Sequence, residues 1–253
     1  MSAPLIVIPT YDELDNVRPI AAAVLAVLPA AHILFVDGNS PDGTGAALDG
    51  MAVADARIHV LHQTSKVGLG RAYIAGFRWA LERDYPWVFE MDADFSHDPK
   101  EIPRFLEVAR QAHVVLGSRY LNGIRITNWP LRRLLLSMGG ALYVRWITGM
   151  PFTDPTGGYK CFRREVLAAI DLDSIRSNGY SFQIEMTHTA WCLGFKVTET
   201  PITFEERRSG YSKMSGRIFK EALWQVWRLA LRNLLRRPGA PRPLPVAPPE
   251  AAA

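Results

Sequence analysis

Asp92 and Asp94 stand two residues apart, directly after an apolar run at 87–91 whose β-branched and aromatic residues predict a buried strand. Side chains two apart in a strand point to the same side, so we expect both carboxylates to face one way. Two such carboxylates repel each other unless a cation or hydrogen-bond donors lie nearby. Carboxylate oxygens that leave other coordination positions of the ion open suit Mg²⁺ or Mn²⁺, which are hard ions that also bind phosphate oxygens. The pair therefore indicates a divalent metal site.

A structural interpretation competes with the metal site. A helix N-cap accounts for Asp98, which precedes Pro99 at the expected start of a helix. It does not account for Asp92 or Asp94. The Asp-x-Asp pattern by itself occurs often by chance, and its position after a buried strand is what favours the metal site.

The apolar periodicity predicts the scaffold that holds these carboxylates. Strands are expected at 5–8, 33–36, 58–61, 87–91 and 114–116, and helices at 12–28, 68–83 and 99–110. Strands that alternate with helices argue for a mostly parallel sheet covered on both faces, which is the α/β class. Ligands of such sheets bind at the carboxyl ends of the strands. Three of these ends carry polar clusters, at 9–13, 37–42 and 92–94.

Three further aspartates receive different interpretations. Asp37 follows a buried strand, and its carboxylate is expected to face a ligand such as a nucleobase or a ribose hydroxyl. Asp42 follows Pro41 and is expected to cap the next helix. Asp12 is the expected cap of the helix at 12–28.

The second half of the chain has a different pattern. It is predicted to contain an amphipathic helix at 129–148, a turn-rich loop at 154–160, a helix at 182–193, a strand or strand pair at 195–204 and a long basic helix at 215–237. Residues 238–253 are rich in Pro and Ala and are expected to be disordered. The net charge of +4 comes largely from this half, which indicates an anionic surface or ligand.

The overall composition narrows the class of protein. The 253 residues are 48% hydrophobic and 21% charged, which excludes disorder for most of the chain. Two distant cysteines form neither a disulfide framework nor a zinc site, so a reducing compartment is expected. The pattern shows no signal peptide and no convincing transmembrane helix. The basic residues are interleaved with Leu and Trp, which gives no support to nucleic-acid binding.

Basic residues outside the acidic clusters indicate a second anion site. Arg133 and Ser137 lie four residues apart and share one face of a predicted helix, and Arg119 stands at a strand end. Arg207 and Lys213 flank a loop that contains Gly. Together these side chains are able to line an anion site, whereas the alternative for each one alone is a solvated surface charge.

Eight motifs occur in one order along the chain. They are PTYDE (9–13), VDGNSPDGT (36–44), KVGLGRAY (66–73), MDADFSHDP (91–99), GSRY (117–120), DPTGGYK (154–160), GYSFQIEM (179–186) and RRSGYSKM (207–214). This set resembles the dolichol-phosphate or polyprenol-monophosphate mannose synthases, which are members of glycosyltransferase family 2 with a GT-A fold. The resemblance implies a catalytic domain at 1–215, followed by the basic helix at 216–237 and the tail at 238–253.

The resemblance also implies a reaction and a role for each matching residue. Mannose would pass from GDP-mannose to a polyprenyl phosphate, with inversion at the anomeric carbon. The implied roles are donor binding for Pro9, Tyr11, Glu13, Asp37, Asp92 and Ala93, binding of Mg²⁺ or Mn²⁺ for Asp92, Asp94 and Ser96, binding of the acceptor phosphate for Arg119, Arg133 and Ser137, and catalysis for Asp94, Arg207 and Lys213, the last two bridging both phosphates.

The chemistry of that reaction agrees with these parts. The nucleophile is a phosphate oxygen that is already ionised at neutral pH, so no general base is required. The protein has to hold two anionic groups in line and stabilise the leaving diphosphate, which calls for a metal and several cations. Asp154 is therefore expected to be structural or to bind the sugar.

A lipid acceptor implies contact with a membrane. The helices at 129–148 and 215–237 are expected to lie on its cytoplasmic side, with Trp and Leu side chains inserted into the membrane and Arg side chains in contact with anionic headgroups. The alternatives are packing of the second helix on the catalytic domain and a membrane-protein partner.

Two other functions stay open from the sequence. One is a polyprenyl-phosphate glucosyl- or N-acetylglucosaminyltransferase that uses a UDP-sugar, because no residue chemistry in the motifs distinguishes the bases. The other is a non-catalytic subunit that binds a nucleotide sugar. The presence of two separate anion sites argues against the second.

Overall fold

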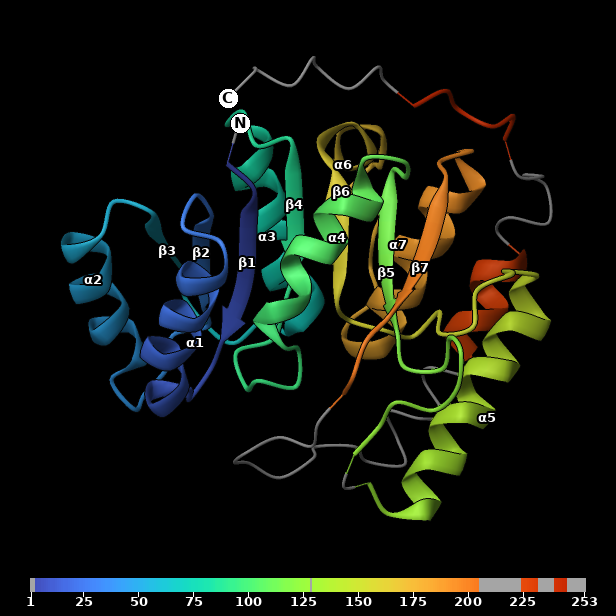
Figure 1. The fold of residues 1–253 in the computed structure, drawn as a ribbon, viewed down its shortest axis with the longest axis horizontal. Coiled ribbons are helices and arrows are strands. Elements are labelled where there is room, and N and C mark those ends of the chain that lie inside the picture. Colours follow the sequence, from blue (N-terminus) through green and yellow to red (C-terminus); the bar gives the residue numbers. More distant parts are fainter. Residues whose placement is uncertain (1–2, 128, 205–223, 232–238, 245–253) are drawn as a thin grey trace.

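The computed structural model describes residues 3–127, 129–204, 224–231 and 239–244. Its centre is a seven-stranded sheet with the order β3-β2-β1-β4-β6-β5-β7 (Figure 1). The strands are β1 Leu5–Thr10, β2 His32–Asp37, β3 Ile58–His62, β4 Trp87–Glu90, β5 Val114–Ser118, β6 Lys160–Arg163 and β7 Val197–Pro201. Every neighbouring pair is parallel except the two pairs that contain β6. The predicted mostly parallel α/β sheet is confirmed.

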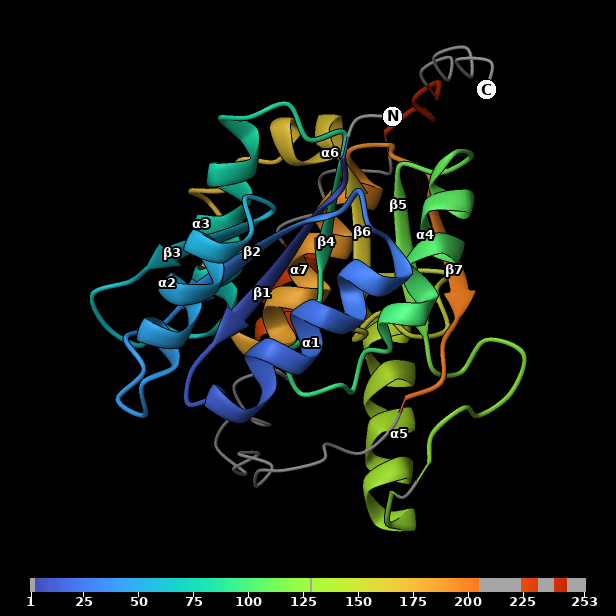
Figure 2. The ribbon, with the colours of Figure 1, turned by 60° about the vertical axis from the view of Figure 1, so that its left-hand side comes forward.

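Helices cover both faces of this sheet. They are α1 Leu14–Val27, α2 Thr44–Ala54, α3 Leu69–Leu81, α4 Ile102–Ala109, α5 Leu131–Thr148, α6 Arg164–Ala169 and α7 Gly179–Cys192, with a 3₁₀ turn η1 at Pro99–Glu101. Apolar residues of α1, α2 and α4 form the core on one face, and those of α3, α6 and α7 form the core on the other (Figure 2). The strands alternate between the two cores, since Ile6 faces the first and Val7 the second. This explains why the central residues of β1 and β2 are all apolar.

The start of α1 differs from the prediction. Asp12 has a positive φ of 57° and precedes the helix, which begins at Leu14. Asp42 takes over the capping role, because its Oδ2 accepts from the Leu14 N–H at 3.1 Å. Its Oδ1 also accepts from the Thr44 N–H at 3.0 Å, at the start of α2. One carboxylate therefore accepts hydrogen bonds from backbone N–H groups at the start of two helices. Local sequence rules do not predict the bond to α1, because its two partners are far apart in the sequence.

The C-terminal part was only partly predicted. Helix α6 was missed, and α7 begins at Gly179 rather than at 182. In the tail that is expected to be disordered, residues 239–244 are described, and there the Gly239 N–H donates to Cys192 O at 2.9 Å and the Arg242 N–H donates to Gly194 O at 3.0 Å. The disorder of the tail stays a prediction. Of the predicted helix at 215–237, the structure describes residues 224–231, which are helical. No helix in the described ranges is long and apolar enough to cross a membrane.

Candidate active site

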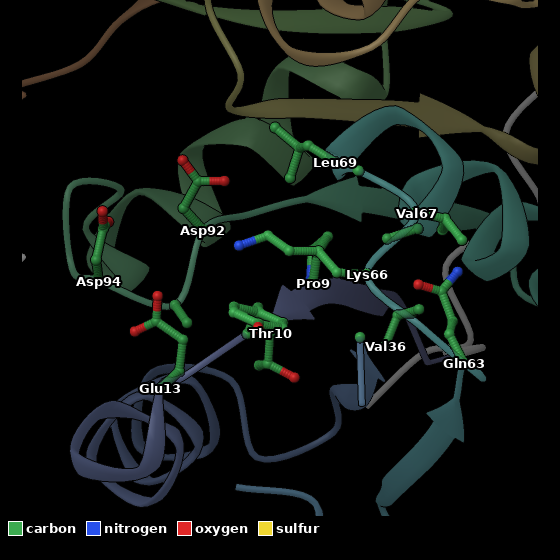
Figure 3. A pocket seen from close by; sticks show the side chains of 15 residues that line it. Pro9, Thr10, Glu13, Val36, Gln63, Lys66, Val67, Leu69, Asp92 and Asp94 are labelled. Atoms are coloured by element: carbon green, nitrogen blue, oxygen red, sulfur yellow. The ribbon is translucent and has the colours of Figure 1, made fainter. Parts of the chain in front are cut away.

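A pocket opens at the carboxyl ends of β1, β2 and β4, where the strand order changes direction. This is the position at which open α/β sheets bind ligands. The lining residues come from the ends of these strands and the turns after them, from the segment between β3 and α3, and from the first turn of α3: Pro9, Thr10, Tyr11, Glu13, Val36, Gly38, Gln63, Lys66, Val67, Gly68, Leu69, Ala72, Asp92, Ala93 and Asp94 (Figure 3). The polar clusters at 9–13 and 92–94 therefore meet in space, and the cluster at 37–42 contributes Gly38.

One end of the pocket is acidic. Figure 3 shows Asp92, Asp94 and Glu13 on the same side of the cavity. Side-chain alternation within a strand, which was the predicted cause of this arrangement, is wrong, because β4 ends at Glu90 and both aspartates lie in the turn after it. The turn itself brings them to the pocket, and Phe95 within it has a φ of 62°, which is strained for an aromatic residue.

Each carboxylate of this end has a neighbour that orients it. The Tyr73 hydroxyl donates to Asp92 Oδ1 at 3.3 Å. Burial, together with the charge of Asp92, raises the pKa of Tyr73 well above its usual range, so the phenol stays protonated and donates. The Ser96 N–H donates to Asp94 Oδ1 at 3.0 Å. Ser96 is 2% exposed and supports Asp94 through its backbone, so its predicted role as a metal ligand stays a prediction.

His97 fixes the backbone of the acidic turn. Its Nδ1 accepts from the Asp92 N–H at 3.0 Å, so this nitrogen carries no proton. The ring is 3% exposed and stacks on Tyr159 with the ring centroids 4.8 Å apart. A backbone bridge joins His97 to Phe204, and a second bridge joins Phe204 to Ile126. The acidic turn is thereby tied to the segment that leads to the predicted phosphate-binding residues.

The remaining predicted donor residues divide into two groups. Pro9, Tyr11 and Ala93 line the pocket as expected. Asp37 is 2% exposed, and its neighbours Val36 and Gly38 line the pocket instead. Its carboxylate accepts from the Ser40 hydroxyl at 2.6 Å and from the Ser40 N–H at 3.2 Å. Asp37 thus organises the turn after β2 in this structure, and contact with a donor stays a prediction.

Sequence reasoning missed part of the lining. Gln63, Lys66 and Val67 enter the pocket from the segment between β3 and α3, and Leu69 enters it from the start of α3. The Lys66 ammonium lies 3.5 Å from the ring centroid of Tyr11, in a cation–π contact. The motif KVGLGRAY at 66–73 was the signal available for this segment.

The predicted acceptor-phosphate residues also come together. Arg133 lies over Trp129, with its Cζ 4.1 Å from the ring centroid, and Arg119 lies 5.8 Å from the same ring. The Tyr120 hydroxyl donates to Ser137 Oγ at 2.7 Å. Helix α5 thus brings Arg133 and Ser137 to the end of β5, near Arg119, and binding of a phosphate by this cluster stays a prediction.

Arg119 is held by a buried carboxylate. Its Nε donates to Asp154 Oδ2 at 2.6 Å, and its Nη2 donates to Asp154 Oδ1 and to Thr156 Oγ1, both at 2.8 Å. Burial alone would raise the pKa of Asp154, but the charge and hydrogen bonds of Arg119 outweigh it and lower this pKa. The structural interpretation of Asp154 is favoured. Binding of an acceptor phosphate by Arg119 stays a prediction, and the Nη1 atom is the part of the guanidinium outside these bonds.

A second buried ion pair stands behind the acidic turn. Glu90 Oε2 and Lys160 Nζ lie 3.6 Å apart across β4 and β6, and both residues are fully buried. Burial raises the pKa of Glu90 to about 7 and lowers that of Lys160. The Lys160 ammonium also donates to the backbone oxygen of Gln183 at 2.9 Å. The pair holds the antiparallel strand β6 against the base of the site, and the sequence analysis did not identify it.

Comparison with known proteins decides the family. The model of "Glycosyl transferase family 2" matches residues 5–171, which include β1 to β6 and the whole pocket. The chain belongs to glycosyl transferase family 2. Two curated relatives of this glycosyltransferase are each 49% identical to it. One is an undecaprenyl-phosphate mannosyltransferase of Micrococcus luteus, for which the match covers 90% of this chain and 95% of the relative. The other is a polyprenol monophosphomannose synthase of Mycolicibacterium smegmatis, with 92% and 89% covered.

Solved structures of other glycosyltransferases share the fold. A glucosyl-3-phosphoglycerate synthase from Mycobacterium tuberculosis, solved with Mn²⁺, UDP and phosphoglyceric acid, has a TM-score of 0.62 and 16% identity, with 95% of this chain and 80% of that chain covered. A mannosyltransferase from Pyrobaculum calidifontis, solved with GDP-Man and Mn²⁺, has a TM-score of 0.56 and 14% identity, with 94% and 65% covered. At these identities the likeness shows the GT-A-type fold.

Two of the three predicted catalytic residues cannot be placed. Arg207 and Lys213 lie outside the residues that the structure describes. Phe204, the last described residue before them, is bridged to His97, whose ring bonds to the acidic turn, and to Ile126, in the segment between β5 and α5.

The hydrogen bond of His97 leads to a test in this glycosyltransferase. Replacing His97 with Leu leaves the Asp92 N–H without its acceptor, and we expect kcat to fall roughly 10- to 100-fold, the range for residues that orient metal or phosphate ligands. His97→Asn places an oxygen near the position of Nδ1 and is expected to recover most of this loss. Both variants lose the stack on Tyr159, so steady-state kinetics of the pair isolates the hydrogen bond. Equal kcat values for the two would contradict the positioning role.

Proposed function

We propose that this glycosyltransferase transfers mannose from GDP-mannose to a polyprenyl phosphate, with inversion at the anomeric carbon. The observation that carries the proposal is the pairing of an acidic pocket with a separate arginine cluster, in a chain that matches nearly the full length of two mannosyltransferases with polyprenyl-phosphate names. A pocket for a metal-bound diphosphate beside a site for a phosphate is what transfer between two anionic substrates requires.

The carboxylates at the acidic end of the pocket are suitable ligands for Mg²⁺ or Mn²⁺. Asp92 and Asp94 supply hard carboxylate oxygens, and Glu13 lies on the same side of the pocket (Figure 3). Within the described residues no cluster of three or more His, Cys, Asp or Glu forms a complete metal site. This agrees with an ion that is held by one or two carboxylates and completed by the substrate diphosphate and water. When bound, such an ion supplies positive charge to the leaving diphosphate.

The residues of the chain would divide the remaining work. Pro9, Tyr11 and the segment at 66–69 bind the donor, and Asp92 and Asp94 orient its diphosphate. Arg133 and Ser137 bind the acceptor phosphate, with Arg119 behind them. An oxygen of that phosphate forms the new bond to the anomeric carbon from the face opposite the diphosphate, and the bond from this carbon to the diphosphate oxygen breaks. The phosphate is already ionised, so no residue has to remove a proton.

Helix α5 supports the proposed contact with a membrane. Leu131, Leu135, Met138, Leu142 and Trp146 form a stripe with helical spacing, and they are 67, 59, 37, 63 and 81% exposed. In Figure 1 the helix projects from the edge of the molecule to which the strands' carboxyl ends point. Arg132 and Arg145 flank the stripe, where they are able to reach lipid headgroups. We place this contact on the cytoplasmic side, in line with the free cysteines Cys161 and Cys192.

The described part of the C-terminal helix has one buried apolar face and one exposed apolar face. Val226 and Leu229 are 1% and 5% exposed and pack with Val144 of α5. Trp224 and Leu231 are 71% and 60% exposed. The segment 224–231 therefore packs on α5 and extends its exposed apolar surface, which favours a joint role in the proposed membrane contact.

Binding to vesicles tests the stripe. Replacing Leu142 and Trp146 together with Ser removes two apolar anchors, and we expect binding to vesicles with anionic phospholipid to weaken roughly 30-fold, equivalent to about 2 kcal/mol. Val53→Ser is the matched control, because Val53 is 91% exposed on α2, on the opposite side of the molecule in Figure 1. Cosedimentation measures all three proteins. Unchanged binding of the double variant would exclude the stripe as the membrane contact.

Transfer of labelled sugar into an organic-extractable product tests the reaction. Purified protein is mixed with a polyprenyl phosphate and either GDP-mannose or UDP-glucose, with Mg²⁺ or with EDTA. We expect mannose transfer that EDTA abolishes. Transfer only from UDP-glucose would show that the proposed donor is wrong, and would leave the assigned fold and the type of reaction unchanged. Nucleotide binding without transfer from either donor would favour a non-catalytic subunit or a requirement for a membrane-protein partner.

A further inference from the structure

The donor pocket has two chemically different ends. Asp92, Asp94 and Glu13 line one end, and Val36, Gln63 and Val67 line the other (Figure 3). A metal-bound diphosphate belongs at the carboxylate end. A nucleoside diphosphate that is anchored there has to extend its nucleobase toward the other end, where apolar side chains pack against a flat ring.

Gln63 is rigidly placed at this second end. It directly follows β3, and its backbone N–H donates to Asp37 O at 2.8 Å, which ties it to the end of β2. The side chain is half-buried and lines the pocket. Its amide group makes no hydrogen bond to any of the described residues. A half-buried amide in a pocket gains from a ligand that supplies both a donor and an acceptor.

We propose that Gln63 is the residue that reads the nucleobase of the donor. The edge of guanine presents the O6 acceptor next to the N1–H donor. The Gln63 amide matches this edge, since Nε2 donates to O6 and Oε1 accepts from N1–H in one plane. The inference rests on the proposed GDP-mannose donor and adds the residue that contacts its base.

The contact is remote from the reacting bond, so it acts on binding rather than on chemistry. Removing it should raise the Kd for GDP and the KM for GDP-mannose equally, with kcat unchanged. A purely structural role of Gln63 would instead alter kcat or the melting temperature. The split between KM and kcat therefore separates the two roles.

Two variants and one control make the test. Gln63→Leu keeps a similar size and removes both hydrogen bonds, and we expect GDP to bind about tenfold more weakly in calorimetry with Mg²⁺ present. Gln63→Glu replaces the Nε2 donor with a carboxylate oxygen that repels O6 of guanine, and we expect GDP binding to weaken at least as much as in Gln63→Leu. Thr64→Val, an exposed change in the same segment that does not line the pocket, should match wild type.

The outcomes separate this inference from the proposed function. If the wild-type protein transfers mannose from GDP-mannose and Gln63→Leu binds GDP normally, the base-reading role is wrong and the proposed function stands. If the wild-type protein does not use GDP-mannose, the proposed donor fails, and with it the assignment of Gln63 to guanine. A tenfold loss of GDP affinity in Gln63→Leu, with kcat and melting temperature unchanged, supports both.

Discussion

Asp94→Asn is expected to lower mannosyl transfer on the order of a thousandfold, at the upper end of the effect of removing one group that stabilises charge in a transition state. The carboxylate lines the acidic end of the pocket, and a neutral amide is a poor ligand for Mg²⁺ or Mn²⁺ beside a diphosphate. The fold should survive, because the amide oxygen is still able to accept the Ser96 N–H that now bonds to Asp94 Oδ1. Activity is lost, and the melting temperature stays near that of wild type.

Asp98→Asn provides the matched control for this result. It makes the same change four residues away, at an exposed position whose side chain caps the turn η1 by accepting from the Lys100 N–H at 3.0 Å. Asn is an equally good cap, so transfer should remain near wild type. Transfer and binding of Mn²⁺ in the presence of GDP are measured for both variants. Normal turnover by Asp94→Asn would refute the metal role of this carboxylate.

The largest expected effect on stability comes from the buried pair of Arg119 and Asp154. Asp154→Ala leaves the Arg119 guanidinium, which is 5% exposed, without its partner. Breaking a buried ion pair in this way costs about 3–5 kcal/mol. In a chain of this size that corresponds to a fall in melting temperature of roughly 10 °C. Calorimetry or urea unfolding followed by circular dichroism measures the loss.

An exposed pair of the same chemistry serves as the control. Arg78 and Asp173 also form an ion pair, but their side chains are 50% and 86% exposed. Asp173→Ala should therefore change the free energy of unfolding by no more than about 1 kcal/mol. Equal losses in the two variants would show that burial of Arg119 does not control the effect.

The buried pair also predicts a dependence on pH. The pKa of Asp154 is lower in the folded protein than in the unfolded chain, so the folded state releases this proton more readily. The stabilisation is complete above the unfolded pKa of about 3.9 and is lost as the pH falls through the folded pKa. Wild type should lose stability over this acidic range, and Asp154→Ala should lack that part of the loss.

Local patterns in the sequence determined the sheet and the place of the pocket. A strand that is buried on both faces needs a mostly apolar sequence, and β1 and β2 have one apart from the terminal residues Thr10, His32 and Asp37. Asp92 and Asp94 marked the end of the apolar run, although β4 itself ends at the buried Glu90. Because parallel strands end at one edge, three distant polar clusters were predicted to meet, and two of them line one pocket with polar side chains, whereas the cluster at 37–42 contributes Gly38. Helical spacing likewise predicted that Arg133 and Ser137 share a face.

The tertiary structure alone decided which polar groups are paired and which face the pocket. Asp37 and Gln63 both stand at strand ends, yet Asp37 turns away to bond with Ser40 whereas Gln63 lines the cavity. Arg119 meets Asp154, 35 residues further along the chain, because β6 inserts antiparallel beside β5. Periodicity reports how deeply a residue is buried. Periodicity does not identify the partner of a buried charge, because that partner depends on which distant segments the topology brings together. A buried charge that is left unpaired destabilises the fold, so a partner of opposite charge is required there.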